Sequence, residues 1–221
     1  MVKPVAIFDL DSTLLEGDCE ILWVEFLAKR GLVDEPYVKQ VQIFAQEYLE
    51  GTLNYADFEY HLQKPLLHRS AAEGQDLVGA FLAGIEQYFR PFMLQRLAEH
   101  RRQGCAAILA TAANSLLAQP IAQKLGMDTF ICTQMEVIDG IPTGKIVGFP
   151  PFREGKVEKI KTWMAEQPVT LSGSWAYSDS YNDMPILNLV ENPVAVTPDE
   201  NLRRTAQEKG WPILEKAAQA L

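Results

Sequence analysis

The fold of this chain is most strongly constrained by an alternation of short apolar runs with helical segments from residue 91 to residue 209. Short apolar runs bounded by polar residues indicate buried strands. Within this range they are found at residues 105–110, 129–132, 174–177 and 193–196, and a further run lies near the start of the chain at residues 5–8. Helical patterns lie between them, at 91–103, 115–125, 154–165, 184–189 and 199–209. This alternation predicts a parallel sheet that is covered by helices on both faces.

Between the first strand and residue 90 the pattern is helical only. Apolar side chains recur every three or four residues over 20–27 and 35–49, and Asn54 and Ser70 are suited to cap two further helices, to Leu67 and to Phe89. Later in the chain, Asp139-Gly140 predicts a hairpin between residues 135–138 and 145–147. The predicted fold is therefore α/β: a Rossmann-like parallel-sheet core at 1–15 and 90–221, with an all-helical domain at 16–89 inserted after the first strand.

Charge and cysteine content narrow the class of protein. Lys and Arg total 20 against 29 Asp and Glu, and the resulting net charge of −9 argues against general binding to nucleic acid or to anionic membranes. Cys19, Cys105 and Cys132 are an odd number at wide spacings, which fits neither a zinc motif nor a complete disulfide framework. No apolar stretch approaches the roughly 20 residues that span a bilayer. We therefore expect a cytoplasmic protein with reduced thiols and a small-molecule partner.

Two carboxylates, Asp9 and Asp11, directly follow the first predicted strand. Polar residues also follow the other strands: Thr111 ends the second, and Asp179 and Asp183 follow the fourth. Parallel strands joined by right-handed crossovers have their carboxyl ends on the same side, so these side chains are expected to converge there. An Asp-x-Asp pair after a strand is also common as a turn or a helix cap, and the pair by itself leaves both interpretations open.

Converging carboxylates repel one another unless a cation holds them, and ligation by oxygen atoms suits Mg²⁺ together with a phosphate group. A hydroxyl, a lysine and backbone amides are suited to bind the remaining phosphate oxygens. One carboxylate can then attack phosphorus, and a second can transfer the proton of the leaving group.

Four segments, in this order, resemble the haloacid dehalogenase superfamily of phosphohydrolases, in its phosphoserine phosphatase-like branch. They are Asp9-Leu10-Asp11-Ser12-Thr13-Leu14, the strand that ends in Thr111, Lys156, and Asp179-Ser180-Tyr181-Asn182-Asp183. The inserted helical domain corresponds to the cap of such enzymes.

The resemblance implies a role for each matching residue. Asp9 would be the nucleophile and a magnesium ligand, and Asp11 the general acid and base with its carbonyl on the metal. Asp179 would ligate the metal and Asp183 would lie in its outer shell. The phosphate would be bound by a further group of residues, which comprises Thr111, Ala112, Lys156 and Asn182.

The same resemblance leaves the substrate open. Asp18, with Glu16 and Glu20 as near alternatives, lies where a phosphoserine phosphatase has the acid that meets the substrate amine. The position of the arginine that binds the substrate carboxylate is occupied by Tyr60, which cannot form a bidentate cationic contact. We therefore expect a small phosphomonoester other than phosphoserine, such as the amine-bearing histidinol phosphate on which relatives act. Two further candidates for substrate contact are His61 and Arg153.

Two alternative functions remain at this point. The first is a phosphotransferase that passes the same aspartyl phosphate to an alcohol. The second is a non-catalytic phosphate-binding or signalling module, against which the retention of both Asp9 and Asp11 argues. Cap movement is expected at hinges near residues 15–17 and 90–91, because substrate has to enter between the cap and the core.

Overall fold

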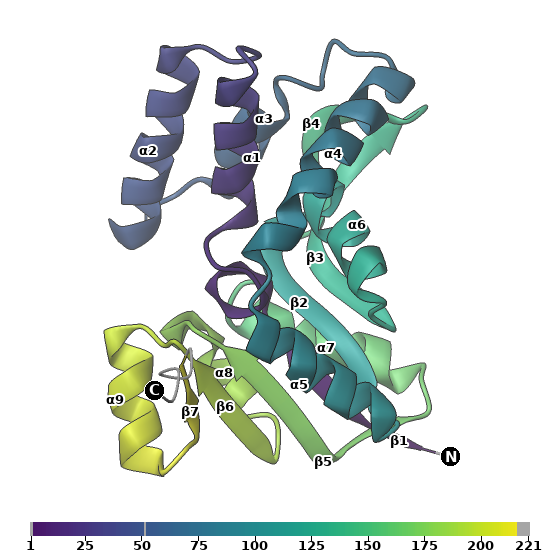
Figure 1. Ribbon diagram of the computed structural model, residues 1–221, viewed down its shortest axis with the longest axis vertical. Helices are drawn as coiled ribbons and strands as arrows, with labels where there is room; N and C mark the ends of the chain where they lie inside the picture. Colours follow the sequence, from purple (N-terminus) through teal and green to yellow (C-terminus); the bar gives the residue numbers. More distant parts are fainter. Residues whose placement is uncertain (1, 51, 216–221) are drawn as a thin grey trace.

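The computed structural model describes residues 2–50 and 52–215, and it shows an α/β fold built on one mixed sheet (Figure 1). The strand order is β4-β3-β2-β1-β5-β6-β7, in which β3 and β4 pair antiparallel and all other neighbours pair parallel. The strands are β1 (Lys3–Phe8), β2 (Ala106–Asn114), β3 (Thr129–Ile138), β4 (Ile141–Val147), β5 (Val169–Ser178), β6 (Asn192–Val196) and β7 (Ile213–Leu214). The helices are α1 (Cys19–Lys29), α2 (Glu35–Glu50), α3 (Tyr55–Gln63), α4 (Ala71–Ile85), α5 (Pro91–Arg102), α6 (Ser115–Leu125), α7 (Glu154–Ala165), α8 (Met184–Leu187) and α9 (Glu200–Lys209). The predicted fold class is confirmed.

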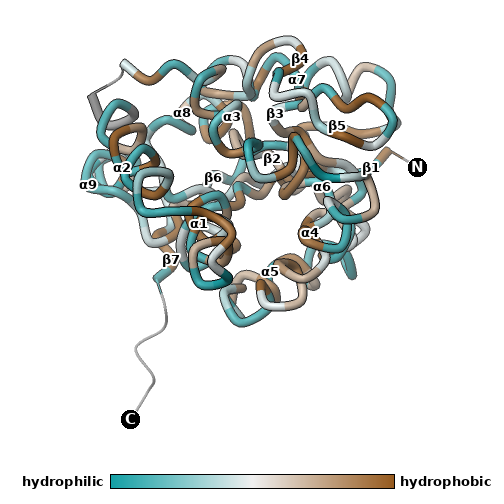
Figure 2. The backbone as a smooth tube through the Cα atoms, turned by 90° about the horizontal axis from the view of Figure 1, so that it is seen from above, coloured by the Kyte–Doolittle hydropathy of each residue, from teal (hydrophilic) through white to brown (hydrophobic). Residues whose placement is uncertain are grey.

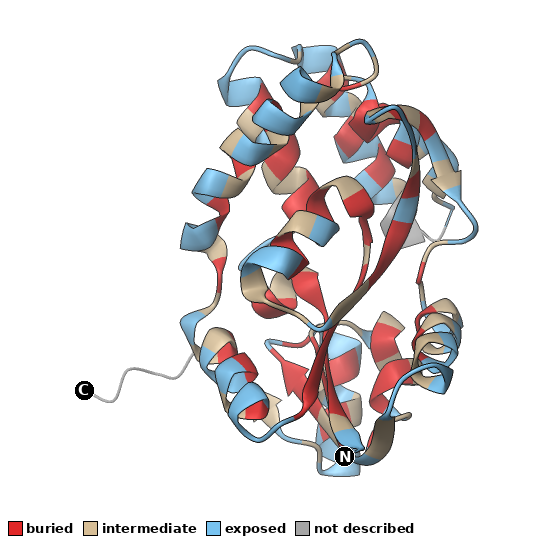
Figure 3. Ribbon diagram, turned by 90° about the vertical axis from the view of Figure 1, so that its right-hand side faces the viewer, coloured by how far each residue is buried: buried red, intermediate tan, exposed pale blue. Residues whose placement is uncertain are grey.

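The two faces of the sheet bury separate apolar clusters, because successive side chains of a strand point to opposite faces. Ala6 and Phe8 of β1 belong to a cluster that includes buried residues of α1, α4, α5 and α6. Val5 and Ile7 belong to a second cluster, with residues of α7, α8 and α9. Figure 3 shows these buried residues in red along the central strands, and Figure 2 shows α9 as a mainly hydrophilic outer helix.

The position of β1 in the sheet determines where a ligand can bind. β1 pairs with β2 on one side and with β5 on the other, so the chain leaves β1 in one direction and later returns to its opposite edge. The carboxyl ends of β1, β2 and β5 therefore flank a point at which the strand order reverses, and open α/β sheets bind ligands at such points.

The helices between β1 and α5 begin at side-chain caps. Asp18 accepts hydrogen bonds from the backbone N–H groups of Glu20 and Ile21 and starts α1, and Asn54 does the same for α3. Ser70 and Glu73 form a reciprocal capping box at the start of α4. These caps satisfy amide groups that have no partner within the helix, and the predicted caps Asn54 and Ser70 are confirmed.

This helical segment contacts the core at two places. The chain leaves the core near Leu15 and returns to it near Phe89, and these two segments lie side by side. Leu15 and Phe89 form an antiparallel bridge, and the Arg90 N–H donates to the carbonyl of Leu14 at 2.9 Å. On the far side, α3 packs against β4, where the backbone N–H of Gly144 donates to Oε1 of Gln63. The predicted domain boundaries and hinges stay predictions.

Several predicted elements have different limits in the structure. The strand predicted at 129–132 and the first hairpin strand at 135–138 are a single strand, β3, which pairs with β2 at its start and with β4 at its end. β2 continues past Thr111 to Asn114. The helix that was predicted to reach Leu67 ends at Gln63, and α4, which was predicted to reach Phe89, ends at Ile85. The short strand β7 was not predicted. In the described ranges, no helix combines the length and apolar character needed to cross a bilayer.

Candidate active site

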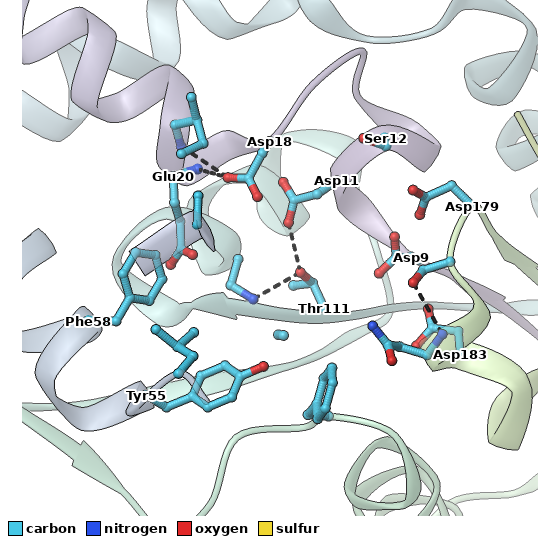
Figure 4. Close-up of a pocket in the computed structure, with 18 of the residues that line it drawn as sticks. Asp9, Asp11, Ser12, Asp18, Glu20, Tyr55, Phe58, Thr111, Asp179 and Asp183 are labelled. Carbon is cyan, nitrogen blue, oxygen red and sulfur yellow. Dashed lines mark hydrogen bonds between the residues drawn. The ribbon is translucent and has the colours of Figure 1, made fainter. Parts of the chain in front are cut away.

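A cavity of about 520 Å³ lies between the carboxyl ends of the central strands and the helical segment. Its volume is in the range of small-molecule sites. The lining residues come from both parts of the fold: Asp9, Asp11, Ser12, Asp18, Glu20, Ile21, Val41, Phe44, Ala45, Leu53, Tyr55, Phe58, Glu59, Thr111, Ala112, Ala113, Phe152, Lys156, Asp179, Ser180, Asn182, Asp183 and Asp199. Figure 4 shows Asp179 and Asp183 at one end of this group, Thr111 in the middle, and Glu20, Tyr55 and Phe58 at the other end.

The turn after β1 presents Asp9 and Asp11 to the cavity. β1 ends at Phe8, and Leu10–Leu14 form a tight turn in which Ser12 has a φ of 53°, a left-handed conformation that is uncommon outside glycine. The turn also directs Thr13 inward, where its hydroxyl lies 3.1 Å from Oδ2 of Asp9 and 3.2 Å from Oδ1 of Asp179. The backbone N–H of Asp179 donates to the same hydroxyl oxygen. Thr13 thus joins the end of β1 to the end of β5.

Lys156, in the first turn of α7, binds two of the carboxylates. Its ammonium group donates to Oδ1 of Asp9 at 2.9 Å and to Oδ2 of Asp183 at 2.7 Å, and all three side chains are buried. Ser178 also donates to Oδ2 of Asp183, at 2.7 Å. Burial alone would lower the pKa of Lys156, but the charges of Asp183 and Asp9 outweigh it and raise this pKa, so the ammonium stays protonated.

One lysine does not compensate all the acids at this end of the cavity. The pKa of Asp9 is raised to about 6, with burial as the largest cause, the Lys156 ammonium opposing it and the charge of Asp183 adding to it. Burial, followed by the charges of Asp9 and Asp183, raises the pKa of Asp179 to about 8. These raised pKa values indicate excess negative charge that a bound cation would stabilise.

The donor set at this end fits Mg²⁺. The described residues contain no group of three or more His, Cys, Asp or Glu side chains that could hold a metal ion by themselves. Mg²⁺ does not require such a group, since it is commonly bound by one or two carboxylates together with water and substrate phosphate. Asp9 and Asp179, which lie on either side of the Thr13 hydroxyl, are the two carboxylates suited to it. Asp183 is engaged by Lys156 and Ser178, which suits an outer position.

Thr111 and Ala112 lie where β2 departs from regular pairing. The register between β2 and β3 shifts between Ala110 and Asn114, so residues 111–113 form an irregularity of the kind that often occurs beside active sites. The Thr111 hydroxyl donates to Oδ2 of Asp11 at 3.3 Å and accepts a hydrogen bond from the Ala113 N–H. The prediction that the strand ends at Thr111 is wrong, yet this irregularity still turns Thr111 into the cavity.

The opposite end of the cavity is acidic. The Asp18 side chain caps α1 and also lines the cavity. Glu20, on the same helix, accepts hydrogen bonds at Oε1 from the backbone N–H of Asn114 at 3.0 Å and from its side-chain Nδ2 at 2.6 Å. Glu59, on α3, also faces the cavity, and only 1% of its surface is exposed.

Two residues predicted to contact substrate lie outside this cavity. Tyr60 is 47% exposed on the outer side of α3, where its ring lies against Gly144 of β4. The His61 ring stacks on Tyr37 at 4.2 Å and its Nε2 lies 3.0 Å from the Tyr37 carbonyl oxygen. Both line a separate surface pocket rather than the main cavity, and their predicted contact with substrate stays a prediction. The phase of α3, set by its packing on β4, turns these side chains away and turns Glu59 inward.

Arg153 lies at the rim. Its Nε donates to Oδ1 of Asn182 at 3.2 Å and its guanidinium group lies over the Phe152 ring, whereas Asn182 and Phe152 themselves line the cavity. This arrangement lets Arg153 orient the side chain of Asn182 at the edge of the cavity.

Sequence reasoning assigned no role to four side chains that the structure brings to this site: Thr13, Glu59, Asn114 and Ser178. Thr13 and Ser178 lie inside or next to the recognised segments, so their position was a usable signal. Glu59 shares a helix face with Tyr55 and Leu62, at steps of four and three residues, which is the periodicity of an inward face. Nothing local marks Asn114, because its hydrogen bonds with Glu20 join residues 94 positions apart.

Comparison with known proteins places the chain in a defined group. Residues 6–188 match the family of haloacid dehalogenase-like hydrolases. The chain is 36% identical over 220 residues to a histidinol-phosphatase of Neisseria meningitidis, which covers 96% of this chain and 99% of that protein. It is 31% identical over 225 residues to the phosphoserine phosphatase SerB1 of Mycobacterium tuberculosis, which covers 94% of this chain and 69% of that protein. A crystal structure of a Bordetella pertussis protein of unknown function superposes with a TM-score of 0.88 at 33% identity, covering 97% of this chain and 99% of the other.

Proposed function

The chain belongs to the haloacid dehalogenase-like hydrolase family, and from this we propose that it is a magnesium-dependent phosphatase that hydrolyses a small phosphomonoester through an aspartyl phosphate on Asp9. One observation carries the proposal: the Asp9 carboxylate is held by Lys156 and Thr13 at the end of β1, while Asp11, two residues on, faces the same cavity. In this proposal residues 16–89 form a cap over a core of residues 1–15 and 90–221.

The first half of the reaction transfers the phosphoryl group to Asp9. A carboxylate oxygen of Asp9 attacks phosphorus as the bond from phosphorus to the leaving oxygen breaks, and Asp11 gives its proton to that oxygen. Burial, followed by the charges of Asp18 and Asp9, raises the pKa of Asp11 well above its ordinary value, which favours the protonated form needed for this step.

In the second half, the Asp11 carboxylate takes a proton from the water molecule that attacks phosphorus, and Asp9 leaves as a free carboxylate together with inorganic phosphate. Lys156, Thr111 and the backbone at Ala112 are suited to bind the phosphoryl oxygens, with Asn182 beside them. Mg²⁺, bound by Asp9, Asp179 and the carbonyl of Asp11 with Asp183 outside them, would neutralise the negative charge of the phosphoryl group.

The pocket argues against phosphoserine as the preferred substrate. Phosphoserine carries a carboxylate, yet among the described residues that line the cavity Lys156 is the single lysine, arginine or histidine, and it binds Asp9 and Asp183. Histidinol phosphate, which the name of the Neisseria meningitidis relative suggests, has an amine and an imidazole and no carboxylate. It is therefore the first substrate to assay.

The test is phosphate release from a panel of phosphomonoesters by the wild type and by Asp9→Asn. With Mg²⁺ the wild type should release phosphate, and removal of the metal with EDTA should stop the reaction. Asp9→Asn should reduce kcat at least about 10⁴-fold, since loss of a nucleophile removes the covalent route. Assays with and without added alcohols distinguish hydrolysis from phosphotransfer. Undiminished activity of Asp9→Asn would refute the mechanism.

A further inference from the structure

The loop that follows β5 has a well-defined backbone, because the five successive N–H groups of residues 179–183 all donate to protein acceptors. Three of the acceptor atoms belong to this loop or to the strand before it: the hydroxyl of Ser178 and the hydroxyl and carbonyl of Ser180. The other two come from distant segments. The first N–H of the loop donates to the Thr13 hydroxyl at 3.0 Å, and the third donates to Oδ2 of Asp199 at 2.6 Å. The loop is therefore held from two sides, by the turn after β1 and by the segment after β6.

Asp199 contacts this loop twice. Its backbone N–H donates to the carbonyl of Asp179 at 2.8 Å, and its Oδ2 accepts the N–H of Tyr181. Its second carboxylate oxygen, Oδ1, accepts the N–H of Leu202 at 2.8 Å and so caps α9. A capping role alone would explain the bond to α9. It would not explain the other two bonds, which hold the loop on both sides of residue 180.

The segment that presents Asp199 has an unusual backbone conformation. Thr197 has a φ of 44°, a left-handed conformation that is rare for a β-branched residue. Such conformations persist only where the surrounding structure imposes them, and they are concentrated at functional sites. Here the Thr197 N–H donates to the carbonyl of Leu214 in β7 at 2.8 Å, and its hydroxyl accepts a hydrogen bond from Nη1 of Arg90 at 2.9 Å. These contacts hold the strained residue two positions before Asp199.

Arg90 joins this segment to the place where the chain returns from the helical segment to the core. Its Nε donates to the carbonyl of Leu15 at 3.2 Å, while its Nη1 donates to Thr197. A guanidinium group can bind two acceptors at once because it is planar and its donors have fixed directions. Arg90 thus connects the end of the turn that carries Asp9 to the segment that holds the loop of Asp179.

We propose that Arg90, Thr197 and Asp199 position Asp179 for the binding of Mg²⁺. Asp199 is the positioning residue in direct contact with the loop, and Arg90 acts on it through Thr197. The inference rests on the proposed phosphatase function and adds the segment after β6 to its metal site. Asp179 is held at both backbone polar atoms, its N–H by Thr13 and its carbonyl by Asp199. Because Mg²⁺ requires nearly octahedral geometry at short distances, loss of one of these contacts should weaken the binding of the metal.

The experiment measures the free energy of unfolding of the full chain in urea as a function of Mg²⁺ concentration, without substrate. The value at zero Mg²⁺ reports the stability of the fold, and the increase with Mg²⁺ gives the Kd for the metal. Asp199→Ser is the test variant, since serine also caps helices but has a single side-chain oxygen in place of the two that bind α9 and the loop. Its Kd should be at least about fivefold higher, the effect expected for one hydrogen bond. Glu200→Gln, which removes an exposed charge from the next residue, is the matched control and should stay within about twofold.

Thr197→Val tests the part assigned to Arg90, because valine keeps the branched shape of threonine and removes the hydroxyl that accepts from Arg90. The Kd for Mg²⁺ should rise about two- to fivefold in this variant. If Arg90 acts through Thr197, Arg90→Met should cause little further rise when it is combined with Thr197→Val. An unchanged Kd in Thr197→Val would overturn the role of Arg90.

Two results would overturn the inference as a whole. In the first, Asp199→Ser lowers the stability at zero Mg²⁺ but has the Kd of the wild type, which would mean that Asp199 only caps α9. In the second, Glu200→Gln raises the Kd as much as Asp199→Ser does, which would mean that only charge matters. Both results leave Mg²⁺ binding by the wild type intact. A wild type whose stability does not respond to Mg²⁺ would instead refute the metal site of the proposed function, and the inference with it, so the two failures are distinguishable.

Discussion

Replacement of Glu59 by glutamine should stabilise the metal-free protein, and the gain should grow with pH. Burial raises the pKa of Glu59 from its ordinary value of 4.5 to about 8. Between these two pH values the folded protein holds a proton on Glu59 that the unfolded chain has lost. Unfolding therefore releases a proton, and the free energy of unfolding falls as pH rises. The stability associated with this carboxyl group is fully present below pH 4.5 and is lost as pH rises through about 8.

The size of the effect follows from the pKa values. Since a tenfold change in a protonation equilibrium corresponds to about 1.4 kcal/mol, raising the pKa from 4.5 to about 8 corresponds to a loss of about 4 to 5 kcal/mol at pH 8. Glutamine has no proton to lose, so Glu59→Gln should avoid this loss. Glu20 and Asp18, which face Glu59, should in the variant experience one fewer negative charge.

The assay is urea denaturation at pH values from 5 to 8.5 in the presence of EDTA, for the wild type, Glu59→Gln and the control Asp57→Asn, which removes one exposed charge from the same helix. The free energies of unfolding of the wild type and Glu59→Gln should be similar at pH 5 and should diverge by several kcal/mol at pH 8. The control should follow the wild type. A difference that does not depend on pH, or a wild type that is the more stable protein at pH 8, would refute the reasoning.

The remaining predictions concern Lys156, Tyr60 and Ser70. Lys156→Met leaves the buried carboxylates of Asp9 and Asp183 without their cation and should lower the free energy of unfolding by about 3 to 5 kcal/mol, measured in urea at pH 7; a loss below 1 kcal/mol would contradict the pairing. Tyr60→Phe should leave kcat/KM for the best substrate within about twofold, because the ring lies outside the cavity; a large rise in KM would return Tyr60 to the substrate site. Ser70→Ala removes the capping box of α4 and should cost about 1 kcal/mol of stability, again measured in urea; an unchanged midpoint would mean that the cap contributes nothing.

Much of the fold was predictable because its signals are local. The strand–helix alternation identified the parallel sheet, and the strand at residues 5–8 followed by Asp9 and Asp11 was recognisable from adjacent residues alone. The caps Asn54 and Ser70 were predicted from the same kind of pattern. The ends of strands that are set by pairing with a neighbouring strand were predicted less well. The extension of β2 beyond Thr111 depends on its contact with β3, which a linear pattern does not contain.

The sequence by itself determined the chemistry proposed for this protein, since Asp9, Asp11 and the acids after β5 each follow a strand and Lys156 lies in the first turn of a helix. Only the tertiary structure decided which side chains of the helical segment meet the substrate. Neighbouring residues of a helix point about 100° apart, so a shift of one position exchanges an inward side chain for an outward one. The packing of α3 on β4 sets that phase, places Tyr60 against Gly144 and turns Glu59 into the cavity. The local periodicity of α3 groups Glu59 with Tyr55 and Leu62, but a contact between residues 81 positions apart decides that this face is the one turned to the cavity.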